Sequence, residues 1–334
     1  MNAFLSKRAD ARAARYNLVG TEQGILLQAI TAYFDVLHDT AVLDLNDNNV
    51  AVLEKQLQAV RDRFAVGVVT RTDVAQAQAR LAAARSGLLG AQATLAASRA
   101  VYREIVGIAP ADLVKPEALP LLPANSVDAI AIARAENPTL DAARAAADSA
   151  RHTAYSAIGD ALPSLKLTGT YQFSEDPSFY GKDREAETTS LEARVSVPIF
   201  RGGRAIFGIS GAQDFRDAVM HDVHKTSNEV SRGVIVAWND YQATTAAIRA
   251  RAEQIEASTI ALEGVREQNK LGTMTTLDVL NAEQELLDAR VGMEEAERNQ
   301  FVSAYGVLAS IGRLTGRALG IEEHKEEQEN DDTR

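Results

Sequence analysis

The chain of 334 residues carries 35 Lys and Arg against 46 Asp and Glu, a net charge of −11, and it contains no cysteine. The acidic balance argues against a nucleic-acid partner, and the lack of cysteine excludes a disulfide framework, a cysteine zinc site and a thiol nucleophile. Aromatic residues make up only 5% of the sequence, while strong helix formers such as alanine are frequent, so a mainly α fold is expected.

The first half of the chain is predicted to be a helical hairpin. Residues 1–66 form one long helix, because apolar or small side chains recur at helical spacing, for example at Ile30, Tyr33 and Leu37. Gly67 interrupts the pattern, and residues 70–107 are predicted to run back as a second helix.

A linker and two shorter helices are predicted next. Four prolines between residues 109 and 125 break any regular structure. A short helix is expected over residues 126–135, and a longer one from Asn137-Pro138 to Gly159.

The period then changes from helical to alternating. After Pro163, apolar side chains lie on one face and polar ones on the other, and the alternation returns from Leu191 to Ile199 after a polar loop, Ser174 to Glu187. Each segment has about 10 residues, the length of a tilted strand that crosses a bilayer. The alternative is a two-stranded ribbon packed on a helix; nothing else in the chain reads as strand, which favours the membrane interpretation.

The last part repeats the helical hairpin. Residues 204–269 are predicted to form the longest helix, Gly272 to turn it, and residues 273–315 to run back. The tail that follows is dominated by charged residues and is expected to be disordered.

The two hairpins are copies at a constant offset of 205 residues. Tyr33, Gly67, Asp73, Leu81 and Gly107 return as Trp238, Gly272, Asp278, Leu286 and Gly312. A long repeat without slippage is typical of a coiled helical array, because each lost residue would rotate every later side chain off its face.

This ordered set of features resembles the TolC-like outer-membrane efflux proteins. The resemblance covers nearly all of residues 1–316. It is carried by the segments 63–74 and 271–280 around the two glycines, by Ala32 to Leu37, by Leu162-Pro163-Ser164-Leu165, and by Val197 to Gly203.

The resemblance implies a fold and a function. The fold is mainly α, with long antiparallel coiled-coil hairpins in two repeats and a two-strand β-hairpin that contributes to a trimeric outer-membrane β-barrel. The function is the exit duct of a tripartite efflux or type I secretion system in the outer membrane and periplasm. The partners are two further copies of the chain, a periplasmic adaptor, an inner-membrane pump and outer-membrane lipid. Substrates pass through unaltered, without a cofactor.

Five segments follow from this interpretation. They are the first-repeat hairpin (1–108), the linker and short helices (109–161), the membrane strands (162–203), the second-repeat hairpin (204–316) and an acidic tail (317–334). By the offset, Met1 corresponds to Ile206, so the strand pair and leader expected before the first hairpin are absent from this sequence. We therefore expect an N-terminally truncated or misannotated member of the family. The alternative is a genuine two-strand variant, which is disfavoured because six strands per trimer would enclose little lumen.

The predicted site residues lie at the two glycine turns. The resemblance places Asp73 and Asp278 near the periplasmic entrance, where three-fold symmetry would make carboxylate rings. The family's second acidic position reads Asn281 here, and the entrance arginine and tyrosine of some members fall on Met274 and Asn269. The alternative, compatible with a gate, is a capping box, because Thr70 with Asp73 and Thr275 with Asp278 match the T-x-x-D pattern.

The turns themselves are predicted to contact the adaptor. The residues concerned are Val66, Gly67, Val68, Leu271, Gly272 and Thr273. The simpler interpretation is that the glycines only permit the turns.

No catalytic or metal site is predicted. The sequence has no Ser-His-Asp set or phosphate loop, and His221 and His224 have no third ligand at suitable spacing. The remaining alternative is a soluble coiled-coil scaffold or periplasmic adaptor without a channel, which gives no reason for two membrane-length alternating segments.

Overall fold

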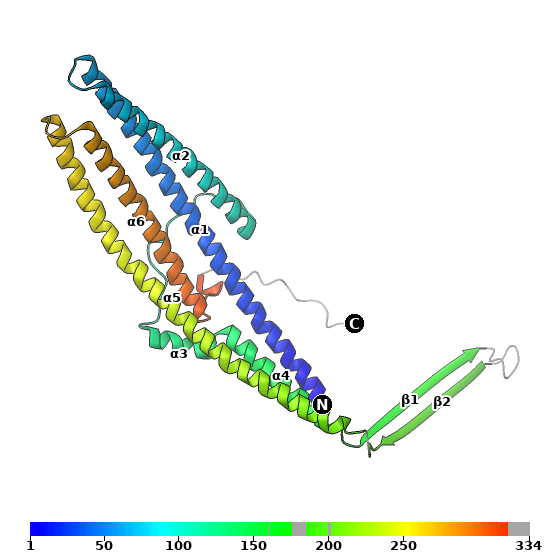
Figure 1. The fold of residues 1–334 in the computed structure, drawn as a ribbon. Helices are drawn as coiled ribbons and strands as arrows, with labels where there is room; N and C mark the ends of the chain where they lie inside the picture. Colours follow the sequence, from blue (N-terminus) through cyan, green and yellow to red (C-terminus); the bar gives the residue numbers. More distant parts are fainter. Residues whose placement is uncertain (160, 176–184, 200–201, 320–334) are drawn as a thin grey trace. The chain divides into compact units, whose positions relative to one another are not determined.

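The structure is a computed structural model that describes residues 1–159, 161–175, 185–199 and 202–319. Within these residues the chain forms six helices, two strands and one 3-10 helix (Figure 1). No helix in the described part of the chain has an apolar stretch long enough to cross a bilayer.

The first hairpin is present as predicted. Helix α1 runs over Asn2–Ala65 and α2 over Arg71–Val106, and the two helices lie antiparallel (Figure 1). A cluster of buried apolar side chains joins them near the turn: Leu53, Leu57 and Val60 of α1, Ala77 and Leu81 of α2, and Leu280 of the second hairpin. The helical spacing of these residues is what places them on one face.

Two shorter helices follow the proline linker. Helix α3 spans Ser126–Glu136 and α4 spans Pro138–Gly159. Two hydrogen bonds fix the linker to α1: the Tyr33 hydroxyl donates to the Val114 carbonyl (2.5 Å) and accepts from the Val114 N–H (3.1 Å).

The alternating segments form an antiparallel pair. Strand β1 spans Ser164–Glu175 and β2 spans Glu185–Ser196, in a register that pairs Leu167 with Ala193 and Lys166 with Arg194. The apolar residues of both strands therefore share one face, as predicted. Side chains on both faces are exposed, Leu167 to 67%, so the ribbon is not packed on a helix within the described residues.

The strand bounds differ from the prediction at both ends. The strands extend further toward the loop, to Glu175 and back to Glu185, and residues 176–184 of that loop lie outside the described residues. At the other end β2 stops at Ser196, so the predicted strand residues Val197 and Ile199 are not in the sheet. Pro198 explains the stop, because proline has no N–H to donate to a strand ladder.

The second hairpin consists of α5, Arg204–Lys270, and α6, Thr276–Ser310, again antiparallel (Figure 1). Helix α6 ends five residues before the predicted Thr315. Gly312 has a φ of +84°, and the Arg313 N–H donates to the Leu308 carbonyl (2.9 Å), which closes a Schellman motif. The predicted tail begins with a 3-10 helix, Arg317–Leu319, and residues 320–334 lie outside the described part.

The chain divides into two compact units. One comprises Met1–Asn17 and Thr139–Ser227, and there the start of α1 packs on α4 through Ser6 and Ser149, whose hydroxyls are 3.0 Å apart. The other comprises Leu18–Pro138 and Asn228–Arg334 and holds the main apolar core, in which Trp238 packs beside Val234, Val307 and Ile311.

Candidate functional site

The two glycine turns have the same geometry. Gly67 and Gly272 adopt φ values of +78° and +77°. At the first turn the Val68 N–H donates to the Arg63 carbonyl (2.9 Å), and at the second the Thr273 N–H donates to the Gln268 carbonyl (3.0 Å). Each turn is thus a Schellman motif that stops the incoming helix, and the positive φ is the reason for glycine.

A capping box starts the return helix after each turn. The Thr70 hydroxyl accepts from the Asp73 N–H (3.3 Å), while Asp73 Oδ2 accepts from the Thr70 N–H (2.8 Å). Thr275 and Asp278 repeat the arrangement at 3.2 and 2.8 Å. The capping role predicted for both aspartates is confirmed.

These contacts keep both carboxylates charged. Hydrogen bonds from the threonine hydroxyl and then from the threonine N–H hold the pKa of Asp73 below its ordinary value. The same two donors, in the same order, lower the pKa of Asp278. The anionic form is favoured because only the carboxylate accepts both donors.

The turns expose large apolar side chains beside the glycines. Val66 is 75% exposed, Val68 71% and Leu271 80%. A Cβ placed on either glycine would have no other group of the described residues within 4 Å beyond its chain neighbours, so the space around both is open. An apolar tip with open space around it is suited to contact with another molecule.

Two arginines connect the hairpins near the turns. Arg63 Nη1 donates to Asn269 Oδ1 (3.0 Å), and Arg80 Nη2 donates to Asn281 Oδ1 (2.6 Å). Asn269 Nδ2 also donates to the Met274 carbonyl (2.9 Å). The predicted gate position Asn281 therefore acts as a hydrogen-bond acceptor between α2 and α6.

No motif or periodicity in the sequence points to Arg63 and Arg80 as contact residues. The sequence feature that could have indicated them is a departure from the repeat. Neither arginine is repeated, because the equivalent residues at the offset of 205 are Gln268 and Glu285. An arginine that is present in only one copy cannot serve a role that both copies share, so it indicates a contact specific to that copy.

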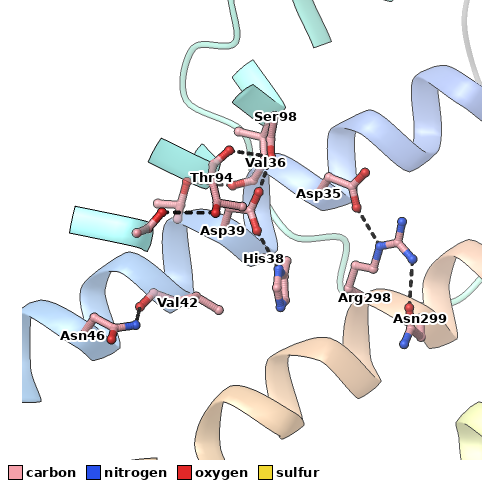
Figure 2. Close-up of polar contacts among 12 residues, drawn as sticks. Asp35, Val36, His38, Asp39, Val42, Asn46, Thr94, Ser98, Arg298 and Asn299 are labelled. Atoms are coloured by element: carbon pink, nitrogen blue, oxygen red, sulfur yellow. Dashed lines mark hydrogen bonds and ion pairs between the residues drawn. The ribbon is translucent and has the colours of Figure 1, made fainter. Parts of the chain in front are cut away.

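A second polar group, also not predicted, joins α1 to α6 (Figure 2). Arg298 Nε donates to Asp35 Oδ1 (2.7 Å), and its Nη1 donates to Asn299 (2.8 Å). On the same turns of α1, His38 Nδ1 lies 2.9 Å from Asp39 Oδ1, and Asp39 accepts from the Ser98 hydroxyl of α2. This group fixes three helices of the two hairpins to one another.

No cluster of three or more His, Asp or Glu with metal-binding geometry occurs in the described ranges of the chain. The described contacts at the turns are hydrogen bonds between helix ends, and they contain no nucleophile next to a base. The arrangement is suited to holding helix ends and carboxylates in place.

Comparison with known proteins shows a family match that includes both helical hairpins. Residues 2–107 and 129–313 match the family model described as outer membrane efflux protein. The outer membrane efflux protein BepC of Brucella suis is 33% identical over 322 residues, which cover 96% of this chain and 70% of that protein. The outer membrane protein TolC of Vibrio cholerae is 28% identical over 91% of this chain and 71% of its own length.

A secretion protein and a solved channel are also similar. The alkaline protease secretion protein AprF of Pseudomonas aeruginosa is 27% identical over 87% of this chain and 60% of its own length. The structure of the outer-membrane channel OprN superposes with a TM-score of 0.80 at 22% identity, covering 93% of this chain and 71% of that one. At that identity the likeness concerns the fold.

Proposed function

Because the chain belongs to the outer membrane efflux protein family, we propose that it is the exit duct of a tripartite efflux or type I secretion system. It is a transport protein of the outer membrane and periplasm and not an enzyme. Substrates pass through the duct without chemical change. The observation that carries this conclusion is the match of both helical hairpins to the family model.

The alternative of a soluble scaffold or adaptor has less support. The strand hairpin exposes an apolar face, with Leu165, Leu191 and Val195 each at least 66% exposed. In water such a face is unfavourable, whereas lipid would cover it. Relatives named for efflux and for protease secretion leave both kinds of cargo as candidates.

The assembly proposed is a homotrimer. The outer edges of β1 and β2 are unpaired within the described residues, and unpaired strand edges are not tolerated in a bilayer. The hairpin therefore requires further strands beside it to close a barrel. A trimer surrounding a tunnel, joined by a periplasmic adaptor to an inner-membrane pump, meets this requirement. A monodisperse monomer in detergent, measured by light scattering, would contradict the trimer.

The turn residues are proposed to contact the adaptor. Val66, Val68 and Leu271 supply exposed apolar surface, and Gly67, Gly272 and Thr273 complete the two tips. Replacing Gly272 by tryptophan should abolish export while trimers remain in the membrane. Unchanged export would remove the tips from the interface.

Asp278, with Asn281 and Asp73, is proposed to form the entrance gate. Asp278 Oδ2 is occupied by the capping box, but the anionic charge is retained and the lowered pKa keeps it at all physiological pH values. Three such carboxylates around a symmetry axis would attract cations and narrow the pore electrostatically.

Single-channel recording in planar bilayers tests the duct and its gate together. We expect cation selectivity and block by a trivalent cation such as hexaamminecobalt added on the periplasmic side. Asp278→Asn should weaken the block more than Asp73→Asn does, and Asn281→Asp, which adds an acid per protomer, should strengthen it. Since asparagine also caps helices well, an Asp278→Asn channel with unchanged block would leave Asp278 with the capping role alone. A protein that forms no channels at all would contradict the duct itself.

A further inference from the structure

A small cavity lies between α1, the proline linker and α6, away from the glycine turns. Its volume is about 200 Å³. The apolar part of its lining comes from Phe34, Leu37 and Phe301, and the Phe34 and Phe301 rings stack with their centres 4.7 Å apart. Polar side chains of the same two helices and of the linker line the rest.

Most charged groups of the lining already have a partner. Lys115 of the linker forms an ion pair with Glu297. Arg298 is paired with Asp35 outside the cavity. Among the described residues, Glu294 is the lining carboxylate for which the structure gives no hydrogen bond or ion pair.

The environment of Glu294 is unfavourable for an isolated carboxylate. Burial, and secondly the negative charge of Glu297, raise its pKa above the ordinary value, although Lys115 and His38 act in the opposite direction. A carboxylate that is partly desolvated without a partner is stabilised by any cation that reaches it.

His38 lines the same cavity, and one of its ring nitrogens is buried without a partner. Its Nδ1 lies 2.9 Å from Asp39 Oδ1, and because an ionised carboxylate only accepts hydrogen bonds, Nδ1 carries the proton in the neutral ring. Nε2 is then an acceptor, and it is buried without a hydrogen-bond partner. Figure 2 shows the ring extending from α1 toward α6.

The described lining therefore offers the Glu294 carboxylate and, after a side-chain adjustment, Nε2 of neutral His38 as acceptors, while Lys115 and Arg298 are engaged by other carboxylates. From this we infer that the cavity between α1, the linker and α6 is a binding site for a small organic cation, an arylalkyl amine whose ring packs beside Phe34 and Phe301 and whose ammonium group donates to Glu294 and His38. The inference is independent of the duct function and concerns a site outside the proposed gate.

The charge and size of the cavity favour this class of ligand over others. An anion would meet Glu294 and Glu297 while both neighbouring cations, Lys115 and Arg298, are already paired. The cavity is smaller than the roughly 300–1,000 Å³ of sites for drug-sized molecules, so the ligand is a compact one. The stacked phenylalanines supply aromatic surface that favours a cation. Contact with Nε2 needs only the side-chain adjustment that is common on binding.

A ligand in this cavity would bridge the two repeat copies. Phe34 and His38 belong to the first copy, whereas Glu294 and Phe301 belong to the second. Binding should therefore raise the thermal stability of the contact between α1 and α6, in addition to giving a measurable affinity.

The test uses benzylamine as the probe, with the purified protein in detergent. Isothermal titration calorimetry should give a Kd of about 0.1–1 mM, as expected for so few ligand atoms. Benzyl alcohol and benzoate, which have the same ring without the positive charge, should bind at least about tenfold more weakly. Equal binding of benzoate or benzyl alcohol, or no binding of benzylamine up to about 20 mM, would overturn the proposal.

Paired variants locate the binding. Glu294→Gln should weaken benzylamine at least about tenfold, because it removes a charge-assisted hydrogen bond. Glu295→Gln, an equal change of charge on the exposed side of α6, should alter the Kd by less than about twofold. His38→Leu, which replaces the imidazole with an apolar side chain of similar size, should weaken binding several-fold. Circular dichroism melting shows that each variant is folded, and equal loss in Glu294→Gln and Glu295→Gln would contradict the site.

Discussion

At the scale of single residues, equivalent positions in the two repeat copies can have different surroundings. Gly107 and Gly312 are equivalent at the offset of 205 and end α2 and α6 with φ values of +87° and +84°. Apart from its chain neighbours, no described residue lies within 4 Å of a Cβ built at Gly107. A Cβ at Gly312 would lie 2.7 Å from the Glu136 carbonyl oxygen and 2.8 Å from Asn137 Cα. Only the second copy therefore needs glycine for packing as well as for its conformation.

We expect unequal effects of alanine at these two positions. Gly107→Ala should cost about 1–2 kcal/mol, the strain of a left-handed conformation. Gly312→Ala should cost a further ~1–3 kcal/mol, because the backbone of residues 136–137 must move to make room. Denaturant unfolding of both variants measures the difference, and equal losses would show that the contact at Gly312 relaxes without cost.

The pH dependence of stability should report on Glu294. Its pKa is raised in the folded state, so the folded protein binds this proton more tightly than the unfolded chain does. The stabilisation is complete below the unfolded value near 4.5 and is lost as the pH rises through the folded pKa. Glu294→Gln should therefore raise Tm at neutral pH and flatten the fall of Tm above pH 4.5. Glu295→Gln is the control, and a profile that Glu294→Gln leaves unchanged would contradict the burial of this carboxyl.

At the scale of elements, the helix ends are determined locally. Both hairpins end α1 and α5 with a Schellman motif and begin α2 and α6 with a capping box. These motifs depend on residues within a few positions of each other, such as Thr70 with Asp73. This is why the sequence predicted the turns well, whereas the end of β2 at Ser196 and of α6 at Ser310 was misplaced by a few residues.

The capping threonines offer a test of this local origin. Thr70→Ala should destabilise the first hairpin by about 1 kcal/mol, since it removes the side-chain acceptor for the Asp73 N–H. Thr70→Ser keeps the hydroxyl and should cost less. Thr72→Ala, an exposed position in the first turn of the helix, serves as the control. An equal loss of stability in Thr72→Ala and Thr70→Ala, measured by differential scanning calorimetry, would contradict the capping box.

The same box has a pH signature of opposite sign to that of Glu294. Because the pKa of Asp73 is lowered in the folded state, its contribution is present above the unfolded value near 3.8 and is lost as the pH falls through the folded pKa. The benefit of Thr70 over alanine should accordingly shrink only in the acid range below that value.

At the scale of the whole molecule, the strand hairpin is the part of the fold that supports the proposed location in the outer membrane. Its cross-strand register places Leu165 with Val195 and Leu167 with Ala193 on one face. Thr170 and Ser190 pair on the other. Both faces are exposed in the single chain. Contact with lipid on the apolar face and with water on the polar face would make this pattern favourable.

Arginine on either face should separate these environments. If the apolar face contacts lipid, Leu167→Arg should destabilise the membrane-inserted protein by up to about 2–4 kcal/mol, depending on how deep residue 167 lies in the bilayer. Thr170→Arg, on the polar face, should be tolerated. The measurement is the yield of trimers in the outer-membrane fraction, with the melting of the helical part as a check on folding. Equal yields for the two variants would show that the faces are not distinguished by lipid.

Sequence alone determined the features that depend on spacing along the chain. The helix period, the alternation of the strands and the capping boxes are local patterns, and each produced an element or a turn in the structure. The repeat at 205 shows the helix period and the capping boxes twice. Tertiary structure decided which side chains from distant segments meet. Some of these contacts join residues about 200 positions apart or more. Examples are the hydrogen-bonded pairs Arg63–Asn269 and Arg80–Asn281, and the shared cavity of His38 and Glu294. No periodicity encodes such contacts, because they depend on how one hairpin packs against the other.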